Sequence, residues 1–262
     1  MQVAMMQPAF MPWQGFFELI YRADIFILLD DFQFSVQSYH QRNRLFVNMG
    51  QADWYSVPVE KNSFKSPLNT TRINESIPWR TKTVKRLLQN YGKAPFFKEI
   101  FPLIEAWLQA KGGSLADQNI ALIRMVCDLL GIRPEFRRSS EFHSVGQRSE
   151  KVLELLNWCG ATRYYCARGS FPYMREDALF PVSGREVLFQ NYIPKPYPQV
   201  GSRENFVPYL SILDALLNIG PEKSAEIVRA GTDHWDTWEE MIQNAETTAD
   251  LFEEVGHVNC AG

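Results

Sequence analysis

The chain of 262 residues is long enough for one large domain, or for one domain with a sizeable insertion. Its 45% hydrophobic and 22% charged residues are typical of globular proteins that fold in water. The formal net charge of -3 argues against a dedicated nucleic-acid-binding protein, which usually presents a basic surface. We therefore expect no nucleic-acid partner, unless a tRNA acts as a donor.

The chain shows no targeting signal, no membrane signal and no metal-binding pattern. Its first basic residue is Arg22, and no run approaches the roughly 20 apolar residues that cross a bilayer. The cysteines form no CxxC pair and have no histidine at zinc-site spacing. We therefore expect a cytoplasmic protein with buried free thiols, no membrane span and no metal.

The N-terminal part predicts a strand, a helix and a second strand. The stretch QVAMM is apolar and ends before Pro8, and GFFELIYRA places Phe16, Phe17 and Ile20 at helical spacing. The stretch DIFILLDD is apolar between its ends, which is typical of a strand buried on both faces. We expect a βαβ unit, whose crossover is nearly always right-handed.

The next part predicts a β-hairpin and then helices. Segments 44–50 and 52–60 alternate aromatic and branched residues, and segment 61–74 is rich in turn residues. Residues 78–132 contain three runs with helical spacing, each followed by a glycine, and Ser114 is placed to cap the third.

Strands and helices alternate again after this helical run. The stretches EFRRSSEF, TRYYCAR and EVLFQNY read as strands, and RSEKVLELLNWCG reads as an amphipathic helix. Because the alternation resumes, we predict that Gln2–Asp31 and Glu135–Tyr192 contribute to one mainly parallel sheet.

The predicted fold class is α/β, with a mainly parallel, nucleotide-binding-like sheet. We expect residues 1–77 and 133–200 to form this sheet domain and residues 78–132 to form a helical insertion. Residues 201–262 predict a C-terminal helical segment with an acidic tail.

Two polar stretches follow the first two predicted strands. In an open parallel sheet, ligands bind beyond the carboxyl ends of the strands. QPAFMPWQG supplies Gln7, Trp13 and Gly15, and Gly15 is placed to open a helix whose N–H groups suit phosphate. DDFQF supplies Gln33. The alternative is that the first stretch is a proline-stiffened packing loop.

Asp30 and Asp31 end the second apolar strand, where an unpaired buried carboxylate costs several kcal/mol. Arg42, Asn43 and Arg44 follow closely. The two arginines are the expected counter-ions, and all three residues are expected to contact phosphate or an oxyanion. Either one aspartate is catalytic or the group is an internal brace. Adjacent strand residues point to opposite faces, so at most one aspartate faces a ligand.

Three further candidates are weaker in the sequence. Ser139 and Ser140 end a strand, where hydroxyls bind sugar or phosphate oxygens or cap the next helix. Ser211 and Asp214 share one face of an apolar helix, where they bind a ligand or meet solvent. His40, beside the Arg-Asn-Arg segment, is the one histidine that we consider catalytic.

Several stretches together carry a family resemblance: MQPAFMPWQGFFELIYRADIFILLDDFQF, QRNRLF, YSVPVEK, RSSEF, GATRYY and LSILDALLNIGPE. They resemble the WbqC-like protein family from Met5 to about Glu222. Many members have His where Met6 stands here. Members often occur in bacterial surface-polysaccharide gene clusters, so the resemblance implies a role in building or decorating the O-antigen sugars of lipopolysaccharide.

The opening unit is also similar to the start of the HIGH-type nucleotidyltransferase and class I synthetase superfamily, which has a Rossmann-like fold. There a loop after the first strand holds nucleotide phosphates against a helix N-terminus. Residues Gln7 to Gly15 occupy that place here, without the His-x-Gly-His of the superfamily. The similarity implies a nucleotide-binding architecture.

The leading hypothesis is an enzyme that modifies a nucleotide-linked amino sugar by acyl or aminoacyl transfer. Such a transfer needs a base for the amine and donors for the oxyanion. The expected cofactor is none beyond an activated acyl donor or nucleotide. A different hypothesis is a non-catalytic binding or assembly factor, with a carrier protein or a second copy as partner. A glycosyltransferase ranks lower, because Asp30 and Asp31 lack D-x-D spacing.

Overall fold

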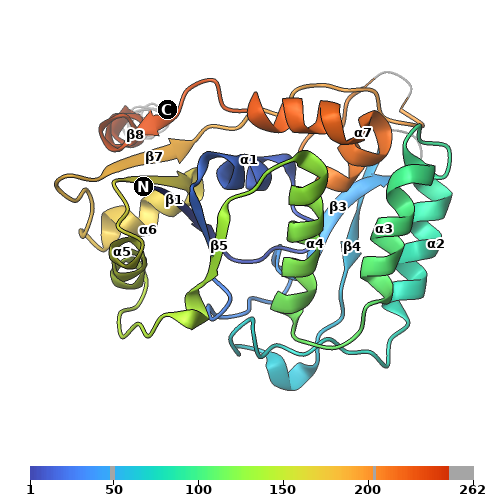
Figure 1. The fold of residues 1–262 in the computed structure, drawn as a ribbon, viewed down its shortest axis with the longest axis horizontal. Coiled ribbons are helices and arrows are strands. Elements are labelled where there is room, and N and C mark those ends of the chain that lie inside the picture. Colours follow the sequence, from blue (N-terminus) through green and yellow to red (C-terminus); the bar gives the residue numbers. More distant parts are fainter. Residues whose placement is uncertain (48–50, 203–204, 248–262) are drawn as a thin grey trace, which may run out of the picture.

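The computed structural model describes residues 1–47, 51–202 and 205–247. Figure 1 shows a twisted sheet on one side of the molecule, with helices α2, α3 and α4 stacked beside a separate hairpin on the other side. No helix among the described residues is both long enough and apolar enough to cross a bilayer.

The central sheet has six strands, of which the first five in its order are parallel. They are β1 (Gln2–Met6), β2 (Ile25–Leu28), β5 (Glu135–Arg138), β6 (Arg163–Ala167), β7 (Glu186–Gln190) and β8 (Asp236–Thr237). The order is β5-β2-β1-β6-β7-β8, and β8 runs antiparallel to β7. The prediction that the N-terminal unit and the residues after the helical run share one mainly parallel sheet is therefore confirmed.

The remaining elements are helices and one antiparallel hairpin. They are α1 (Gln14–Arg22), β3 (Arg42–Val47), β4 (Gln51–Ser56), α2 (Trp79–Tyr91), α3 (Phe97–Gln109), α4 (Leu115–Leu130), α5 (Ser149–Trp158), α6 (Phe171–Glu176) and α7 (Ile212–Arg229). Short 3-10 turns lie at Lys61–Ser63, Ser139–Glu141 and Arg168–Ser170. The expected hairpin begins earlier than predicted because Arg42 already pairs with Ser56.

Alternate residues of the sheet strands face two different cores. Ala4 and Phe26 belong to a large core that contains α1, α2, α3, α4 and α7. Val3 and Ile25 belong to a smaller core that contains α5, α6 and the region around Trp238. The sheet is therefore covered by helices on both faces, as its apolar strands predict.

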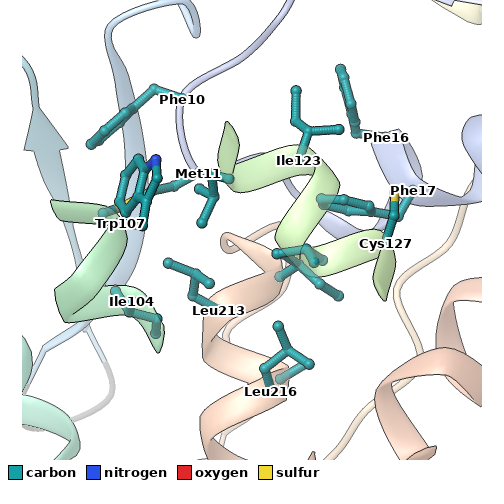
Figure 2. Packing of buried hydrophobic residues seen from close by; sticks show 14 of the residues in the cluster. Phe10, Met11, Phe16, Phe17, Ile104, Trp107, Ile123, Cys127, Leu213 and Leu216 are labelled. Carbon is teal, nitrogen blue, oxygen red and sulfur yellow. The ribbon is translucent and has the colours of Figure 1, made fainter. Parts of the chain in front are cut away.

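The loop between β1 and α1 contributes to the large core. Figure 2 shows Phe10 and Met11 among side chains of α3, α4 and α7, with Trp107 beside Phe10. The rings of Phe10 and Trp107 are 5.8 Å apart. The bulky residues of this loop therefore serve packing, which is the alternative that the sequence left open.

Helix α7 is interrupted at Gly220, which has a φ of 78° and precedes Pro221. A Cβ atom at this position would lie 2.5 Å from the ring of Phe96, so glycine is required both for the backbone conformation and for space. After β8 the chain is helical over residues 238–247. The predicted acidic tail, 248–262, lies outside the described residues.

Candidate functional site

A cavity of about 690 Å³ lies beyond the carboxyl ends of β1 and β6. Met5 and Met6 line it from β1, and Ala167 lines it from β6. The chain builds the sheet from β1 through β2 to β5 on one side, then returns to place β6 and β7 on the other. Ligands of open parallel sheets bind where the strand order reverses in this way. The cavity therefore occupies the expected position of a ligand site.

The lining of this cavity combines apolar side chains with a few polar groups. Leu29, Phe32, Val152 and Tyr164 contribute to its apolar part. Its polar groups are Gln7, Ser35, Ser38, Tyr39, His40, Arg148, Ser170 and Tyr173. A mainly apolar cavity with a small number of placed polar groups is the usual form of a small-molecule site.

Gln7 and His40 form a directed pair in the cavity wall. The backbone N–H of Ser35 lies 3.3 Å from His40 Nδ1, and an N–H can only donate. In the neutral ring the proton is therefore on Nε2, which lies 2.7 Å from Gln7 Oε1. This arrangement fixes the carbonyl oxygen of Gln7 as an acceptor, and its amide N–H groups have no acceptor among the described protein residues.

Burial holds His40 in its neutral form. The side chain is 7% exposed, and loss of solvation lowers its pKa from 6.5 to about 4. At neutral pH the ring therefore donates from Nε2 and does not act as an imidazolium. The consequence is a Gln7 side chain that presents hydrogen-bond donors from a fixed position.

Helix α4 supplies the side chain that holds this wall together. Asn119 of α4 donates from one amide nitrogen to Pro8 O at 2.9 Å and to His40 O at 2.8 Å. The N–H of Phe10 donates to Tyr39 O at 2.9 Å. The loop that carries Gln7 and the segment that carries His40 are thus joined at two points.

Arg148 is the cationic side chain among the described lining residues. It precedes α5 and has a φ of 50°, which is uncommon for a residue with a side chain. Its guanidinium pairs with Glu176 at 2.6 Å and with Asp177 at 3.2 Å. Both partners follow β6 in the chain, so this cation connects the two loops that border the cavity.

Asp30 is fully buried and is saturated with donors. Its carboxylate receives bonds from Arg138 Nε at 2.6 Å, Ser140 N at 3.0 Å and Ser140 Oγ at 2.8 Å. Ser139 Oγ lies 3.3 Å from the same carboxylate. These contacts make Asp30 an internal brace between the ends of β2 and β5, which is the structural one of the two roles that the sequence left open.

Asp31 is held in a similar way at the same sheet edge. It receives bonds from Lys151 Nζ at 2.6 Å and from Ser139 Oγ at 2.5 Å. The expectation that Arg42 and Arg44 are the counter-ions of the aspartates is wrong, because Arg138 and Lys151 take that place. The predicted ligand-binding hydroxyls of Ser139 and Ser140 are likewise used in this brace.

The Arg-Asn-Arg segment lies in β3, away from the aspartates. Arg42 places its guanidinium carbon 4.3 Å from the ring centre of Trp54. Asn43 is buried and donates to Phe10 O and Met11 O, at 3.3 and 2.9 Å. Arg44 accepts a bond from Ser211 N through its backbone. Asn43 therefore shapes the first loop from within and does not meet a ligand.

Trp13, Gly15 and Gln33 also lie outside the cavity lining. The ring of Trp13 packs against Tyr192 and covers Gly15, where a Cβ atom would be 2.4 Å from it. Gly15 is thus required by a packing contact and not by a phosphate. Gln33 is exposed and forms a backbone bridge with Pro67.

Ser211 and Asp214 are structural residues at the start of α7. Ser211 is buried and caps the helix through Leu213 N. Asp214 accepts from the hydroxyls of Tyr91 at 2.7 Å and Tyr197 at 2.6 Å, and from Gln199 at 2.8 Å. Burial raises its pKa against the opposing effect of these donors. Neither residue lines the cavity, so their assignment to a ligand site stays a prediction.

One group of side chains has the spacing of a metal site. Ligand atoms of His234, Asp236 and Glu240 lie within 4.8 Å of one another. Arg168 lies 3.1 Å from Asp236, and Glu240 accepts from the N–H of Thr237 at 2.7 Å.

Several lining residues were not predicted from the sequence. Tyr39, Arg148 and Val152 carry no motif, and Phe32 lies in the DDFQF stretch without having been proposed as a site residue. Tyr173 follows the Arg-Gly-Ser turn after β6, and that position after a strand is the signal that indicates it.

Comparisons with known proteins give one family and one curated relative. The model of the WbqC-like protein family matches residues 7–226. The uncharacterized protein Rv1507c of Mycobacterium tuberculosis is 30% identical over 223 residues, which cover 84% of this chain and 95% of that protein. No solved structure shows significant similarity to the chain.

Proposed function

The chain belongs to the WbqC-like protein family, and we propose that it is an enzyme that transfers an acyl or aminoacyl group to the amine of a nucleotide-linked sugar. The observation that carries this proposal is the cavity where the strand order reverses, between β1 and β6. The parallel part of the order, β5-β2-β1-β6-β7, follows the pattern of doubly wound nucleotide-binding sheets. A Rossmann-like class is part of the proposal.

The lining supports a substrate with three chemically different parts. The apolar side chains of Leu29, Phe32 and Val152 suit an acyl group. The aromatic rings of Tyr39 and Tyr173 offer flat, amphipathic surfaces for a sugar ring. Arg148 pairs with Glu176 and Asp177 through Nη2, so its Nε and Nη1 groups are the donors proposed for phosphate oxygens. A nucleotide-linked sugar that becomes acylated has all three parts.

The proposed reaction is attack of the sugar amine on an activated acyl carbonyl. The new C–N bond forms as the bond between the carbonyl carbon and its leaving group breaks, and the amine proton leaves with that group or to water. Negative charge develops on the carbonyl oxygen, and the N–H groups of Gln7 are the donors proposed to meet it. His40 acts as a positioning residue, because its Nε2–H holds Gln7 Oε1.

In this proposal neither an aspartate nor His40 acts as the catalytic base that the sequence suggested. Asp30 is fully buried against Arg138 and Ser140, and Asp31 is bound to Lys151. His40, with a pKa of about 4, is too weak a base to hold a proton at neutral pH. A sugar amine that is neutral near pH 7 attacks without an enzyme base and loses its proton afterwards.

The test is turnover with a panel of uridine, thymidine and guanosine diphosphate amino sugars and activated acyl donors, with products identified by mass spectrometry. We expect Gln7→Leu to lower kcat by about 10²–10³-fold, the usual effect of removing one oxyanion donor. Gln33→Leu is the matched control, because Gln33 is exposed and does not line the cavity. It should leave kcat unchanged.

Two outcomes contradict the proposal. If ligands of the panel raise the melting temperature but no product forms with any donor, the chain is a binding factor. If product forms equally with Gln7→Leu and Gln33→Leu, the chemistry takes place elsewhere.

A further inference from the structure

A second cavity of about 340 Å³ lies between the hairpin β3–β4 and helix α2. Trp54 lines it from β4, and Trp79, Lys82 and Arg86 line it from α2. Its volume is about half that of the first cavity and lies near the lower end of the range for small-molecule sites. It is therefore suited to a single ring with a substituent and not to a whole nucleotide-linked sugar.

The charge of the second cavity is positive. Of the described residues that line it, Lys82 and Arg86 are cations and none is acidic. Arg86 is already bound to Asp53 at 2.6 Å and to Trp54 O at 2.8 Å. The ammonium group of Lys82, an exposed residue, has no partner within the described chain, so its charge is available to a ligand.

The neutral part of the cavity has the features of a sugar site. Trp54 is 36% exposed and presents a flat aromatic surface, and Thr83 lies in the same wall. The Oε1 atom of Gln41, another lining residue, is buried and receives no hydrogen bond from the described protein atoms. A buried acceptor of this kind requires a donor, which a ligand hydroxyl can supply.

We propose that the second cavity binds an anionic saccharide, a sugar ring that carries a carboxylate or a phosphate. The ring packs on Trp54, a hydroxyl donates to Gln41 Oε1, and the anionic group meets Lys82. A neutral sugar lacks the contact with Lys82, and a bare anion lacks the contacts with Trp54 and Gln41. This site is separate from the transfer reaction proposed for the first cavity.

The two cavities share one wall. Tyr39 and His40 line the first cavity and Gln41 lines the second. The ring of Tyr39 lies 6.0 Å from that of Trp54, between centroids. The anionic saccharide therefore binds directly behind the wall of the proposed active site.

The test is isothermal titration calorimetry of the full chain with four probes: glucuronic acid, glucose 1-phosphate, glucose and inorganic phosphate. We expect at least one of the two anionic sugars to bind more tightly than both glucose and phosphate. Which of the two binds identifies the anion as carboxylate or phosphate. The proposal is overturned if inorganic phosphate binds as tightly as both anionic sugars. It is also overturned if neither anionic sugar binds at millimolar concentration.

Matched lysine variants locate the bound sugar. Lys82→Gln removes the free cation and should weaken the anionic sugar about tenfold, as expected for a lost charge-assisted contact. Lys85→Gln removes an exposed lysine of the same helix that does not line the cavity, and should not change binding. Equal affinities of the two variants overturn the proposal.

A third variant separates this site from the first cavity. Arg148→Gln changes the first cavity and should leave the affinity of the anionic sugar as in the wild type. If Arg148→Gln weakens binding of the anionic sugar and Lys82→Gln does not, the sugar binds in the first cavity. Because binding is measured without an acyl donor, absence of turnover has no bearing on this result.

Discussion

Asp30 and His40 are both buried near the carboxyl edge of the sheet, and the protein accommodates them in different ways. Asp30 is surrounded by donors, with Arg138 Nε at 2.6 Å. His40 has one backbone donor and one amide acceptor, and burial lowers its pKa to about 4. The carboxylate is thus compensated by a cation, whereas the imidazole is kept neutral.

Asp30→Asn should lower the free energy of unfolding by about 3–5 kcal/mol, because it leaves the guanidinium of Arg138 without its buried partner. Asp31→Asn should cost less, about 1 kcal/mol, since Asp31 and Lys151 are partly exposed. Urea unfolding followed by circular dichroism measures both changes. Ligand binding at low urea should survive in both variants, and loss of binding by a fully folded Asp30→Asn protein would restore a functional role for this aspartate.

The buried neutral state of His40 predicts a pH dependence of stability. The pKa of His40 is about 4 in the folded protein and 6.5 ordinarily, so between these values the unfolded chain binds a proton that the folded chain does not. The contribution of His40 is full above pH 6.5 and is lost as the pH falls to about 4. It amounts to roughly 3 kcal/mol.

The measurement is the free energy of unfolding of the wild type and of His40→Gln from pH 7 to pH 4. The quantity that checks the prediction is the wild-type value minus the variant value at each pH. The difference should fall as the pH is lowered, since the variant has no imidazole at this position. His143→Gln, which replaces an exposed histidine, is the control and should follow the wild type. Parallel curves for His40→Gln and the wild type would show that His40 is not held neutral.

The sequence identified Gln7 and His40 as candidates because each follows a strand or adjoins a charged segment. It could not identify the partners of Asp30, since Arg138 is 108 residues away and Ser140 is 110 residues away. The sequence predicts Arg42 and Arg44 as the counter-ions because they lie nearer to Asp30 in the chain. That prediction relied on proximity in the sequence. In the structure, β2 pairs with β5, and this pairing brings Arg138 and Ser140 to Asp30.

At the scale of elements, the wall of the first cavity depends on a helix that does not line it. Asn119 of α4 donates to Pro8 O and His40 O, which are both backbone groups. Asn119→Leu should leave these acceptors unpaired and lower the free energy of unfolding by about 2–4 kcal/mol. It should also weaken binding of any ligand of the first cavity, because Gln7 and His40 lose their relative position.

Ser114→Ala on the same helix is the comparison. Ser114 forms a capping box with Asp117, so its loss should cost about 1 kcal/mol of stability without moving the cavity wall. Thermal melts and ligand titrations of the two variants measure both effects. If Asn119→Leu loses stability but binds ligand like Ser114→Ala, then α4 does not position the wall.

Local patterns predicted most elements well. The strand–helix–strand unit, the hairpin, the capped helix α4 and its glycine end at Gly131, with a φ of 65°, all follow from spacing and capping residues. The first loop was harder to interpret, because Phe10 and Met11 are apolar in a segment with no regular period. They are buried by contacts with α3, α4 and α7, and these long-range contacts cannot be read from the sequence of the loop.

For the whole molecule, the helical insertion and the sheet share one core. Tyr91, Trp107 and Ile123 of the insertion pack in the same cluster as Ala4 and Phe26 of the sheet. We expect one cooperative unfolding transition, with coincident midpoints by far-ultraviolet circular dichroism and by tryptophan fluorescence. Two separated transitions would show that residues 78–132 unfold independently, as a separate domain would.

The segment between the two cavities has a consequence for how their occupants affect each other. Tyr39 lines the first cavity, and its ring packs against Trp54 of the second. If a ligand in one cavity moves the ring of Tyr39, binding in the two cavities becomes linked. Linkage is reciprocal, so a saccharide that tightens the first ligand must itself be held more tightly by the same factor. A titration of either ligand in the presence of the other therefore measures one and the same coupling free energy.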